Sequence, residues 1–238
     1  MTEQSDPGPL ALVGSGEYLP HMAGIEGALI EGRPPRYVQL ATAAVPDGQS
    51  VVERWHRLGT EQAKRLGVEP VIVPVNDRDD AENETMAAMV AGAGLIYLSG
   101  GNPGYLADTI RGTRVWAAIA DAWRAGAALA GCSAGAMVMT SWVPSLRHPK
   151  KGGTKGLDVV PHLRVIPHFD AFLSRFPDMI TRILLPHDPS ITVLGIDEDT
   201  ALVGGPEEWA VQGRQSVWRL TPDGRVEIPS GSTITTPR

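Results

Sequence analysis

The sequence predicts one α/β domain, in which a mostly parallel sheet carries helices on both faces and short antiparallel strands follow near the C-terminus. Two patterns predict this fold class. Through about the first 140 residues, short apolar runs alternate with longer amphipathic segments, as in strands joined by helices. Nearer the C-terminus, short strand-like runs follow one another with only turns between them. Because no linker, repeat or low-complexity tract interrupts the chain, we expect a single domain over residues 1–238.

Five apolar runs in the first part are the expected strands, and each ends near Gly, Pro or Asp. They cover residues 10–14, 37–44, 71–75, 95–100 and 127–133. Apolar residues at helical spacing predict helices in the segments 50–67, 80–94 and 113–126. A sheet of this kind is covered on both faces, and its ligands bind beyond the carboxyl ends of the strands.

The second part has a different pattern. Residues 141–156 lose the apolar period and gain Pro, Gly and Lys, which predicts a surface loop. Residues 163–170 are typical of a strand, and 171–186 of a helix interrupted by Pro. A strand with its turn is expected over 191–205. The closing antiparallel strands are expected at 209–213, 216–220 and 225–231.

Composition excludes several classes of function. A net charge of −6 leaves no electrostatic footprint for a nucleic acid or an acidic membrane, so we expect a small-molecule partner. No apolar stretch approaches the roughly 20 residues that span a bilayer, and the apolar run 10–13 is too short for a signal peptide. One cysteine allows no intramolecular disulfide, which suits a reducing compartment. These features predict a soluble, cytoplasmic protein.

The most informative stretch is GxSxG at residues 131–135, with Ser133 at its centre. Residues 127–132 are a plausible strand and 134–142 a plausible start of a helix, so Ser133 lies at a strand-to-helix junction. That is the context in which glycines allow a sharp turn and expose a serine nucleophile. The alternative is an ordinary helix N-cap, a position that serine also favours. We favour the nucleophile because small residues surround Ser133.

Backbone amides beside Ser133 are expected to stabilise an oxyanion. The first N–H groups of the following helix, beginning with Ala134, carry partial positive charge. A second donor is expected from Gly100 and Gly101, which end the preceding strand at the same sheet edge. Glycine lets a backbone N–H approach a substrate closely, although a plain glycine turn would leave the same signature.

A serine nucleophile needs a base and an orienting acid. Of the six histidines, His168 is the best candidate for the base because it follows a predicted buried strand. The acid is expected among residues 197–199, where strand alternation puts Glu198 on the face opposite to the two aspartates. Asp170, two residues after His168, is the competing candidate.

Four motifs in order give this sequence a family resemblance: LSGGN (98–102), AGCSAGA (130–136), HF (168–169) and GIDEDTALV (195–203). Together they resemble the peptidase E and cyanophycinase family of serine peptidases, which have the class I glutamine amidotransferase-like fold. The resemblance covers about residues 10 to 205. It implies Ser133 as nucleophile, His168 as base, Glu198 as orienting acid, and the Gly101 and Ala134 N–H groups as the oxyanion hole.

The resemblance also bears on Cys132 and on the order of the triad. Amidotransferases of this fold have a cysteine at the central position of the turn, where this chain has Ser133. Cys132 precedes it, so its side chain is expected to point into the core as an inert small residue. The order Ser, His, Glu differs from that of α/β-hydrolases, which argues against an esterase.

Substrate residues are implied more loosely. Cyanophycinases carry an acidic or amide pair after the double glycine, whereas here Asn102 is followed by proline. Peptidase E holds a substrate aspartate with an arginine that follows the histidine in sequence. Arg182 matches the place of that arginine approximately, and Arg175 is a second candidate. A solvated helix arginine is the alternative for both. Gly100 and Asn102 are expected to line the substrate pocket. Residues 14–20, at the same sheet edge, are expected to line it through Glu17 or Tyr18. Glu17 could equally select a basic group.

The sequence therefore predicts a serine hydrolase that cleaves a small peptide or isopeptide bond. No metal or organic cofactor is expected, because no HExxH, CxxC or phosphate-binding glycine motif occurs. The rival is a non-catalytic binding or regulatory module on the same fold. A cysteine-dependent amidotransferase is a third option. The oligomeric state stays open, with a homo-oligomer among the options.

Overall fold

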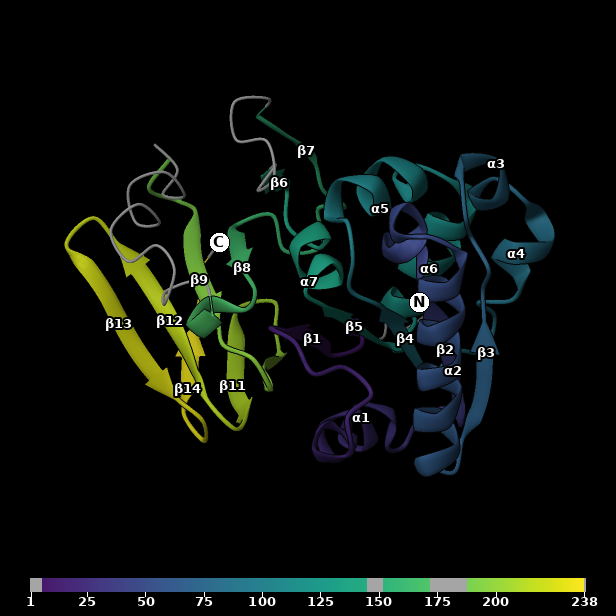
Figure 1. Cartoon of the computed structure of the whole chain (residues 1–238). Coiled ribbons are helices and arrows are strands. Elements are labelled where there is room, and N and C mark those ends of the chain that lie inside the picture. Colours follow the sequence, from purple (N-terminus) through teal and green to yellow (C-terminus); the bar gives the residue numbers. More distant parts are fainter. Residues whose placement is uncertain (1–5, 145–151, 172–187, 238) are drawn as a thin grey trace, which may run out of the picture.

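The computed structural model describes residues 6–144, 152–171 and 188–237, and it has the mixed α/β architecture that the sequence predicts (Figure 1). The large sheet has eight strands in the order β14-β11-β10-β1-β5-β4-β2-β3. Its five parallel strands are β1 (Leu10–Val13), β2 (Arg36–Leu40), β3 (Glu69–Ile72), β4 (Leu95–Leu98) and β5 (Ala128–Cys132). Three antiparallel strands extend it: β10 (Thr200–Gly204), β11 (Glu208–Gly213) and β14 (Thr233–Thr235).

Helices cover both faces of the large sheet, as alternation along the strands requires. From β1, Leu10 and Leu12 pack into one core cluster, whereas Ala11 and Val13 pack into another on the opposite face. The second cluster includes residues of α1 (Ala23–Ile30) and α2 (Gln49–Arg65). The first includes residues of α3 (Arg78–Ala81), α5 (Pro103–Ile110), α6 (Arg114–Arg124) and α7 (Ala134–Val138), with α4 (Glu84–Ala88) packed against it.

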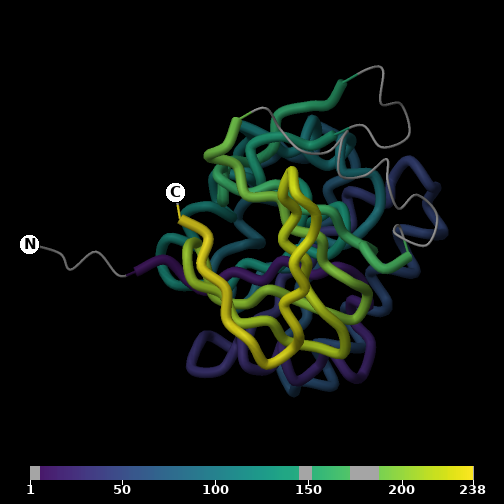
Figure 2. Tube along the Cα trace, turned by 90° about the vertical axis from the view of Figure 1, so that its left-hand side faces the viewer, coloured from purple at the N-terminus to yellow at the C-terminus, as the bar shows by residue number. Residues whose placement is uncertain are grey.

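A second sheet has four strands in the order β13-β12-β9-β8. These are β8 (Leu163–Ile166), β9 (Thr192–Ile196), β12 (Ser216–Thr221) and β13 (Gly224–Pro229). Figure 2 views the molecule from the left-hand side of Figure 1, and there the yellow C-terminal strands lie in front of the purple and blue N-terminal elements. Residues of β8, β9 and β12 join the same core cluster as the large sheet, so the two sheets share a core. The single-domain expectation stays a prediction.

Several predicted boundaries were wrong. The strand expected over 37–44 ends at Leu40, and a 3-10 helix, η2 (Thr42–Asp47), follows it. The reason is tertiary: the Thr42 hydroxyl donates to Val75 O, and the Asn102 N–H donates to Ala43 O at 2.7 Å, so this segment turns across the sheet edge. The strand expected over 71–75 begins earlier and ends at Ile72. The helix expected over 80–94 is broken into α3, α4 and turns.

Other differences concern the second part of the chain. The expected surface loop at 141–156 contains two short strands, β6 (Trp142–Pro144) and β7 (Gly153–Lys155), which pair with each other. The strand expected over 163–170 ends at Ile166, and the chain then bends. Residues 172–187, which hold most of the helix expected at 171–186, lie outside the described residues. The short 3-10 helix η1 (Pro20–Met22) was not predicted. Within the described ranges, no helix is both long and apolar enough to cross a membrane.

Candidate active site

The turn between β5 and α7 holds Ser133 in an uncommon backbone conformation, with φ of 50° and ψ of −107°. The two flanking glycines make this turn possible. A Cβ on Gly131 would lie 2.4 Å from the Gly135 carbonyl, and a Cβ on Gly135 would lie 2.1 Å from Leu98 O. The Ser133 N–H donates to Val13 O at 2.9 Å, which ties the turn to the end of β1. The GxSxG spacing is thus a steric requirement of the turn.

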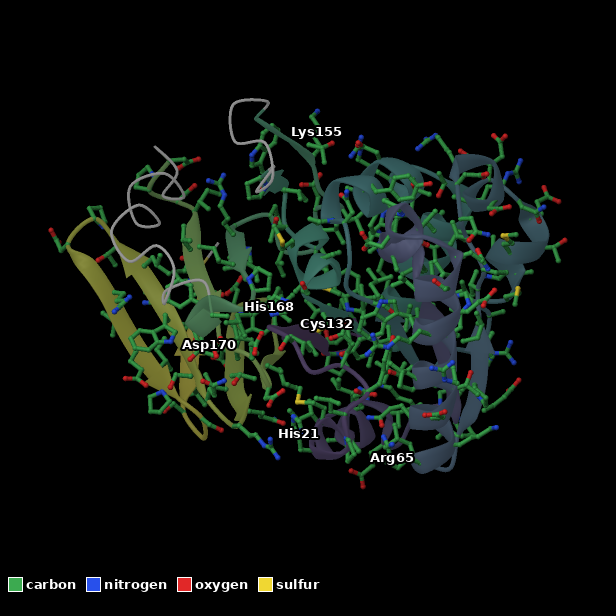
Figure 3. All side chains as sticks on the ribbon, viewed as in Figure 1. His21, Arg65, Cys132, Lys155, His168 and Asp170 are labelled. Atoms are coloured by element: carbon green, nitrogen blue, oxygen red, sulfur yellow. The ribbon has the colours of Figure 1, made fainter. Side chains whose placement is uncertain are left out.

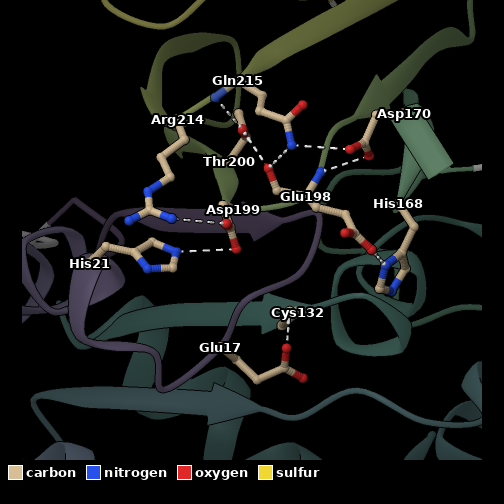
Figure 4. A network of polar contacts seen from close by, with 10 residues as sticks. All are labelled: Glu17, His21, Cys132, His168, Asp170, Glu198, Asp199, Thr200, Arg214 and Gln215. Atoms are coloured by element: carbon tan, nitrogen blue, oxygen red, sulfur yellow. Dashed lines mark hydrogen bonds and ion pairs between the residues drawn. The ribbon is translucent and has the colours of Figure 1, made fainter.

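Three side chains that are distant in sequence form one hydrogen-bonded chain at the edge of the sheets. His168 Nε2 lies 3.1 Å from Ser133 Oγ, and His168 Nδ1 lies 2.8 Å from Glu198 Oε1. The His168 and Glu198 side chains are 42% and 43% exposed, so solvent reaches this imidazole–carboxylate pair. Figure 3 labels His168 and Cys132 near the middle of the molecule, and Figure 4 shows His168 facing Glu198. A hydroxyl, an imidazole and a carboxylate in this order can activate a nucleophile.

Phe169 anchors the turn that carries His168. Its ring is fully buried and packs on β9 at Gly195, where a Cβ would lie 2.3 Å from the ring. His168 itself has a positive φ of 51°. Sequence reasoning gave no role to Phe169 or Gly195, although both belong to the HF and GIDEDTALV motifs. Their contact brings the histidine turn against the strand that leads to Glu198.

The two competing carboxylates have different places. Glu198 contacts the imidazole ring, whereas Asp170 Oδ1 accepts the Glu198 N–H at 3.0 Å. Gln215 Nε2 donates to both Asp170 Oδ2 and Glu198 O, at 3.0 Å each (Figure 4). Asp170 therefore braces the backbone of the turn that presents Glu198. Gln215 was missed because it lies on the connection between β11 and β12, and no sequence signal marks it.

The acidic triplet was expected to alternate as a strand, but residues 197–199 form the connection between β9 and β10. Asp197 is buried and accepts from Trp218 Nε1 at 2.9 Å, and burial raises the pKa of its carboxyl. Asp199 pairs with His21 at 3.1 Å and with Arg214 at 3.6 Å. The three neighbours thus have three separate environments, and only Glu198 contacts His168.

The glycine turn after β4 lies against Ser133. A Cβ on Gly100 would be 3.4 Å from Ser133 Cβ, and one on Gly101 would be 2.3 Å from Ala43 O, where the φ of 140° also favours glycine. The Gly100 N–H already donates to Glu17 Oε1 at 3.0 Å. Ala134 opens α7, so its N–H has no acceptor within the helix. Gly101 and Ala134 remain the predicted oxyanion donors. The Gly100 N–H, which was expected as an alternative donor, is instead bonded to Glu17.

The predicted substrate residues fare differently. Asn102 caps α5, because its Oδ1 accepts the Tyr105 N–H at 3.0 Å. Arg175 and Arg182 lie outside the described residues. Glu17 was expected to line the pocket, but its side chain turns inward and the residue is only 8% exposed. Both of its oxygens accept hydrogen bonds from the protein.

Cys132 is fully buried, as expected of a core residue, but it is not without a polar partner. Its Sγ donates to Glu17 Oε2 at 2.8 Å (Figure 4). Burial and the Glu17 charge raise the pKa of the thiol well above its usual range. A protonated, buried thiol is a poor nucleophile, which argues against a cysteine-dependent reaction here. Among the described residues, no three His, Cys, Asp or Glu side chains are grouped to hold a metal ion.

Comparisons with known proteins place the chain among peptidases. A model of peptidase family S51 matches residues 10–209. A crystal structure of a peptidase from an acI-B1 Actinobacterium is similar to this chain, with 43% identity and a TM-score of 0.88 over 96% of this chain and 97% of the other. A structure assigned to peptidase E from Listeria monocytogenes EGD-e has a similar fold, with 17% identity and a TM-score of 0.63 over 87% and 99% of the two chains. No curated protein matches.

Proposed function

The chain belongs to peptidase family S51, and from this premise we propose that it is a serine peptidase that cleaves a small peptide or isopeptide bond through an acyl-enzyme on Ser133. One observation carries the proposal. Ser133 Oγ, the His168 ring and Glu198 Oε1 form a continuous chain with separations of 3.1 and 2.8 Å. A serine hydroxyl needs such a base to lose its proton near neutral pH.

Glu198 sets the tautomer of the base. With Nδ1–H donating to Glu198, the lone pair of Nε2 faces Ser133 and can accept the hydroxyl proton. As the proton moves to Nε2, Oγ attacks the scissile carbonyl carbon and the carbonyl oxygen becomes an oxyanion. The carboxylate stabilises the imidazolium that forms and keeps its own charge throughout.

The oxyanion is held by the N–H groups of Gly101 and Ala134. When the C–N bond breaks, the imidazolium returns its proton to the leaving amine, and the acyl group stays on Oγ. Water then enters, and as His168 takes one of its protons the water oxygen attacks the acyl carbon. The C–Oγ bond then breaks, the imidazolium returns its proton to Ser133 Oγ, and the acid leaves. These steps use side chains and backbone amides of the chain alone.

The substrate is proposed to be a short peptide, of the Asp-Xaa or β-Asp-Arg class or a related one. The rationale is the resemblance to peptidase E and cyanophycinases, together with a net charge of −6, which disfavours polyanions. The single cysteine fits a reducing compartment, so we place the protein in the cytoplasm.

Fluorophosphonate labelling tests the nucleophile without knowledge of the substrate. Oγ should attack phosphorus with loss of fluoride, while His168 takes the hydroxyl proton. We expect one adduct on Ser133 by mass spectrometry, none on Ser133→Ala, and labelling of Cys132→Ala. A folded wild-type protein that takes no label would favour a non-catalytic module, and loss of labelling in Cys132→Ala alone would favour a cysteine enzyme.

A dipeptide panel tests the substrate class. It should contain Asp-Xaa, β-Asp-Arg and N-terminally blocked peptides, with the Ser133→Ala variant as the blank for each. Release of a free amine from one unblocked class, absent in the variant, would support a peptidase for small substrates. Hydrolysis of blocked and unblocked peptides at equal rates would contradict the small-peptide proposal.

A further inference from the structure

Glu17 lies in the loop after β1, behind the nucleophile turn and outside the acid–base pair. Its carboxylate joins two segments that end neighbouring strands: Oε1 accepts the Gly100 N–H at 3.0 Å, and Oε2 accepts from Cys132 Sγ at 2.8 Å. We propose that Glu17 is a positioning residue that aligns the two halves of the oxyanion hole. This inference rests on the proposed function, since it concerns the amides that would hold the oxyanion.

The first half of the hole is the glycine turn. The amide before Gly101 is fixed by Glu17, and the amide after it is fixed because the Asn102 N–H donates to Ala43 O at 2.7 Å. The peptide group that carries the Gly101 N–H therefore has a fixed neighbour on each side. Without Glu17, one of these two restraints is lost and the Gly101 N–H gains freedom to rotate.

The second half of the hole is the start of α7. Cys132 immediately precedes Ser133, whose φ of 50° requires the chain to be held firmly. The hydrogen bond from Cys132 Sγ to Glu17 restrains Cys132, and the hydrogen bond from the Ser133 N–H to Val13 O restrains Ser133. The position of the next amide, that of Ala134, depends on both anchors. Glu17 thus restrains both donors through one side chain.

The chemistry of the Glu17 site favours a functional role over simple packing. Glu17 is a buried residue, and among the described residues its carboxylate forms no ion pair. Burying a carboxylate away from cations is costly unless its oxygens accept good hydrogen bonds. An apolar side chain would fill the same space at less cost but would hold neither Gly100 nor Cys132.

Fluorophosphonate labelling rates test the proposal, because the phosphoryl oxygen of the reagent occupies the oxyanion hole during attack. We expect Glu17→Ala to lower the second-order rate constant roughly tenfold or more, less than the loss of a whole oxyanion donor. The pH midpoint of labelling should stay that of wild type, since His168 and Glu198 are untouched. Glu31→Ala, an exposed position at the end of α1, is the matched control and should label at the wild-type rate.

Gentler variants keep the test valid if Glu17→Ala fails to fold. Glu17→Gln retains an acceptor for Gly100 but loses the acceptor for the thiol, so an intermediate rate is expected. Cys132→Ser keeps a donor to Glu17 and should label near the wild-type rate, whereas Cys132→Ala should be several-fold slower. If position 132 required only a side chain of a certain volume, a hydroxyl donor would give no such recovery of the labelling rate.

Raman spectroscopy tests the contact itself. Because the chain has one cysteine, its S–H stretching band belongs to Cys132 alone. We expect the band at lower frequency in wild type than in Glu17→Gln. Identical bands, a Glu17→Ala rate within twofold of wild type, or a displaced pH midpoint would each overturn the role of Glu17. Failure of wild type to label at all would instead overturn the proposed function.

Discussion

The two halves of the candidate site are built in different ways. The nucleophile half belongs to the large sheet, where backbone sterics at Gly131, Gly135 and Gly101 decide the geometry and almost everything nearby is buried. The acid–base half lies between the end of β8 and the turn after β9, where two side chains more than two-fifths exposed are held by hydrogen bonds. The geometry of the nucleophile half depends on glycines, which lack a Cβ atom, and that of the acid–base half depends on hydrogen bonds between side chains and their partners.

The two halves therefore tolerate different substitutions. An added methyl group in the nucleophile half meets backbone atoms, which cannot move aside without displacing a strand. In the acid–base half, a changed side chain alters charge or hydrogen bonding while the backbone persists. We therefore expect an isosteric change at Glu198 to disable the acid–base half. In the nucleophile half, loss of the Ser133 hydroxyl apart, we expect the disabling changes to be steric ones at the glycines.

The largest effect is expected from Glu198→Gln. The amide keeps the shape but can favour the wrong tautomer of His168, so labelling and turnover should fall by roughly 10³–10⁴-fold. Asp170→Asn is the matched control. The Asp170 carboxylate accepts from the Glu198 N–H and from Gln215, not from the His168 ring, so the variant should cost about tenfold or less. The pair is compared by fluorophosphonate labelling rates at one pH. A larger loss in Asp170→Asn would reassign the orienting acid.

Next in size is Gly101→Ala, which tests the steric half. Its Cβ would lie 2.3 Å from Ala43 O at a φ that alanine rarely adopts, so the amide must shift. We expect a loss of about 10²–10³-fold in labelling, comparable to removal of one oxyanion donor. Gly104→Ala, in α5, should fold and label normally, because a Cβ there would lie 3.5 Å from its nearest neighbour, Asn102 Oδ1. Equal rates for the two variants would refute the steric account.

The smallest effect on activity is expected from Glu26→Gln, which separates stability from the site. Glu26 lies in α1, accepts the Tyr37 hydroxyl at 2.8 Å, and has its pKa raised from 4.5 to about 7 by burial. Below pH 4.5 the carboxyl is neutral in both states. Between the two pKa values the unfolded chain ionises first, so stability falls as pH rises, by about 3 kcal/mol in total at 1.36 kcal/mol per unit.

Glu26→Gln should remove this pH dependence and leave labelling unchanged. The measurement is urea unfolding from pH 4 to 8.5 for both proteins. The wild-type free energy of unfolding should decline relative to the variant up to about pH 7 and then run parallel to it. Curves that stay parallel throughout would show that Glu26 titrates normally in the folded protein.

The fold class and the family were predictable from sequence because they depend on local features. The parallel strands and the turn at Ser133 could be predicted because their signals lie within short stretches of sequence. These signals are apolar runs, amphipathic spacing and glycines at sharp turns. Boundaries failed where distant contacts intervene, as at Ala43, whose carbonyl accepts from Asn102. The roles of the site residues stay predictions, although Ser133, His168 and Glu198 lie together as expected.

The available side chains, and a sharp turn that presents Ser133, can be inferred from the amino-acid order alone. Which of two carboxylates meets His168, and the inward turn of Glu17 to Gly100 and Cys132, depend on the folded arrangement. The difference arises from distance along the chain. Glu17 and Cys132 are 115 residues apart, and a hydrogen bond across that separation exists only once the strands between them have aligned.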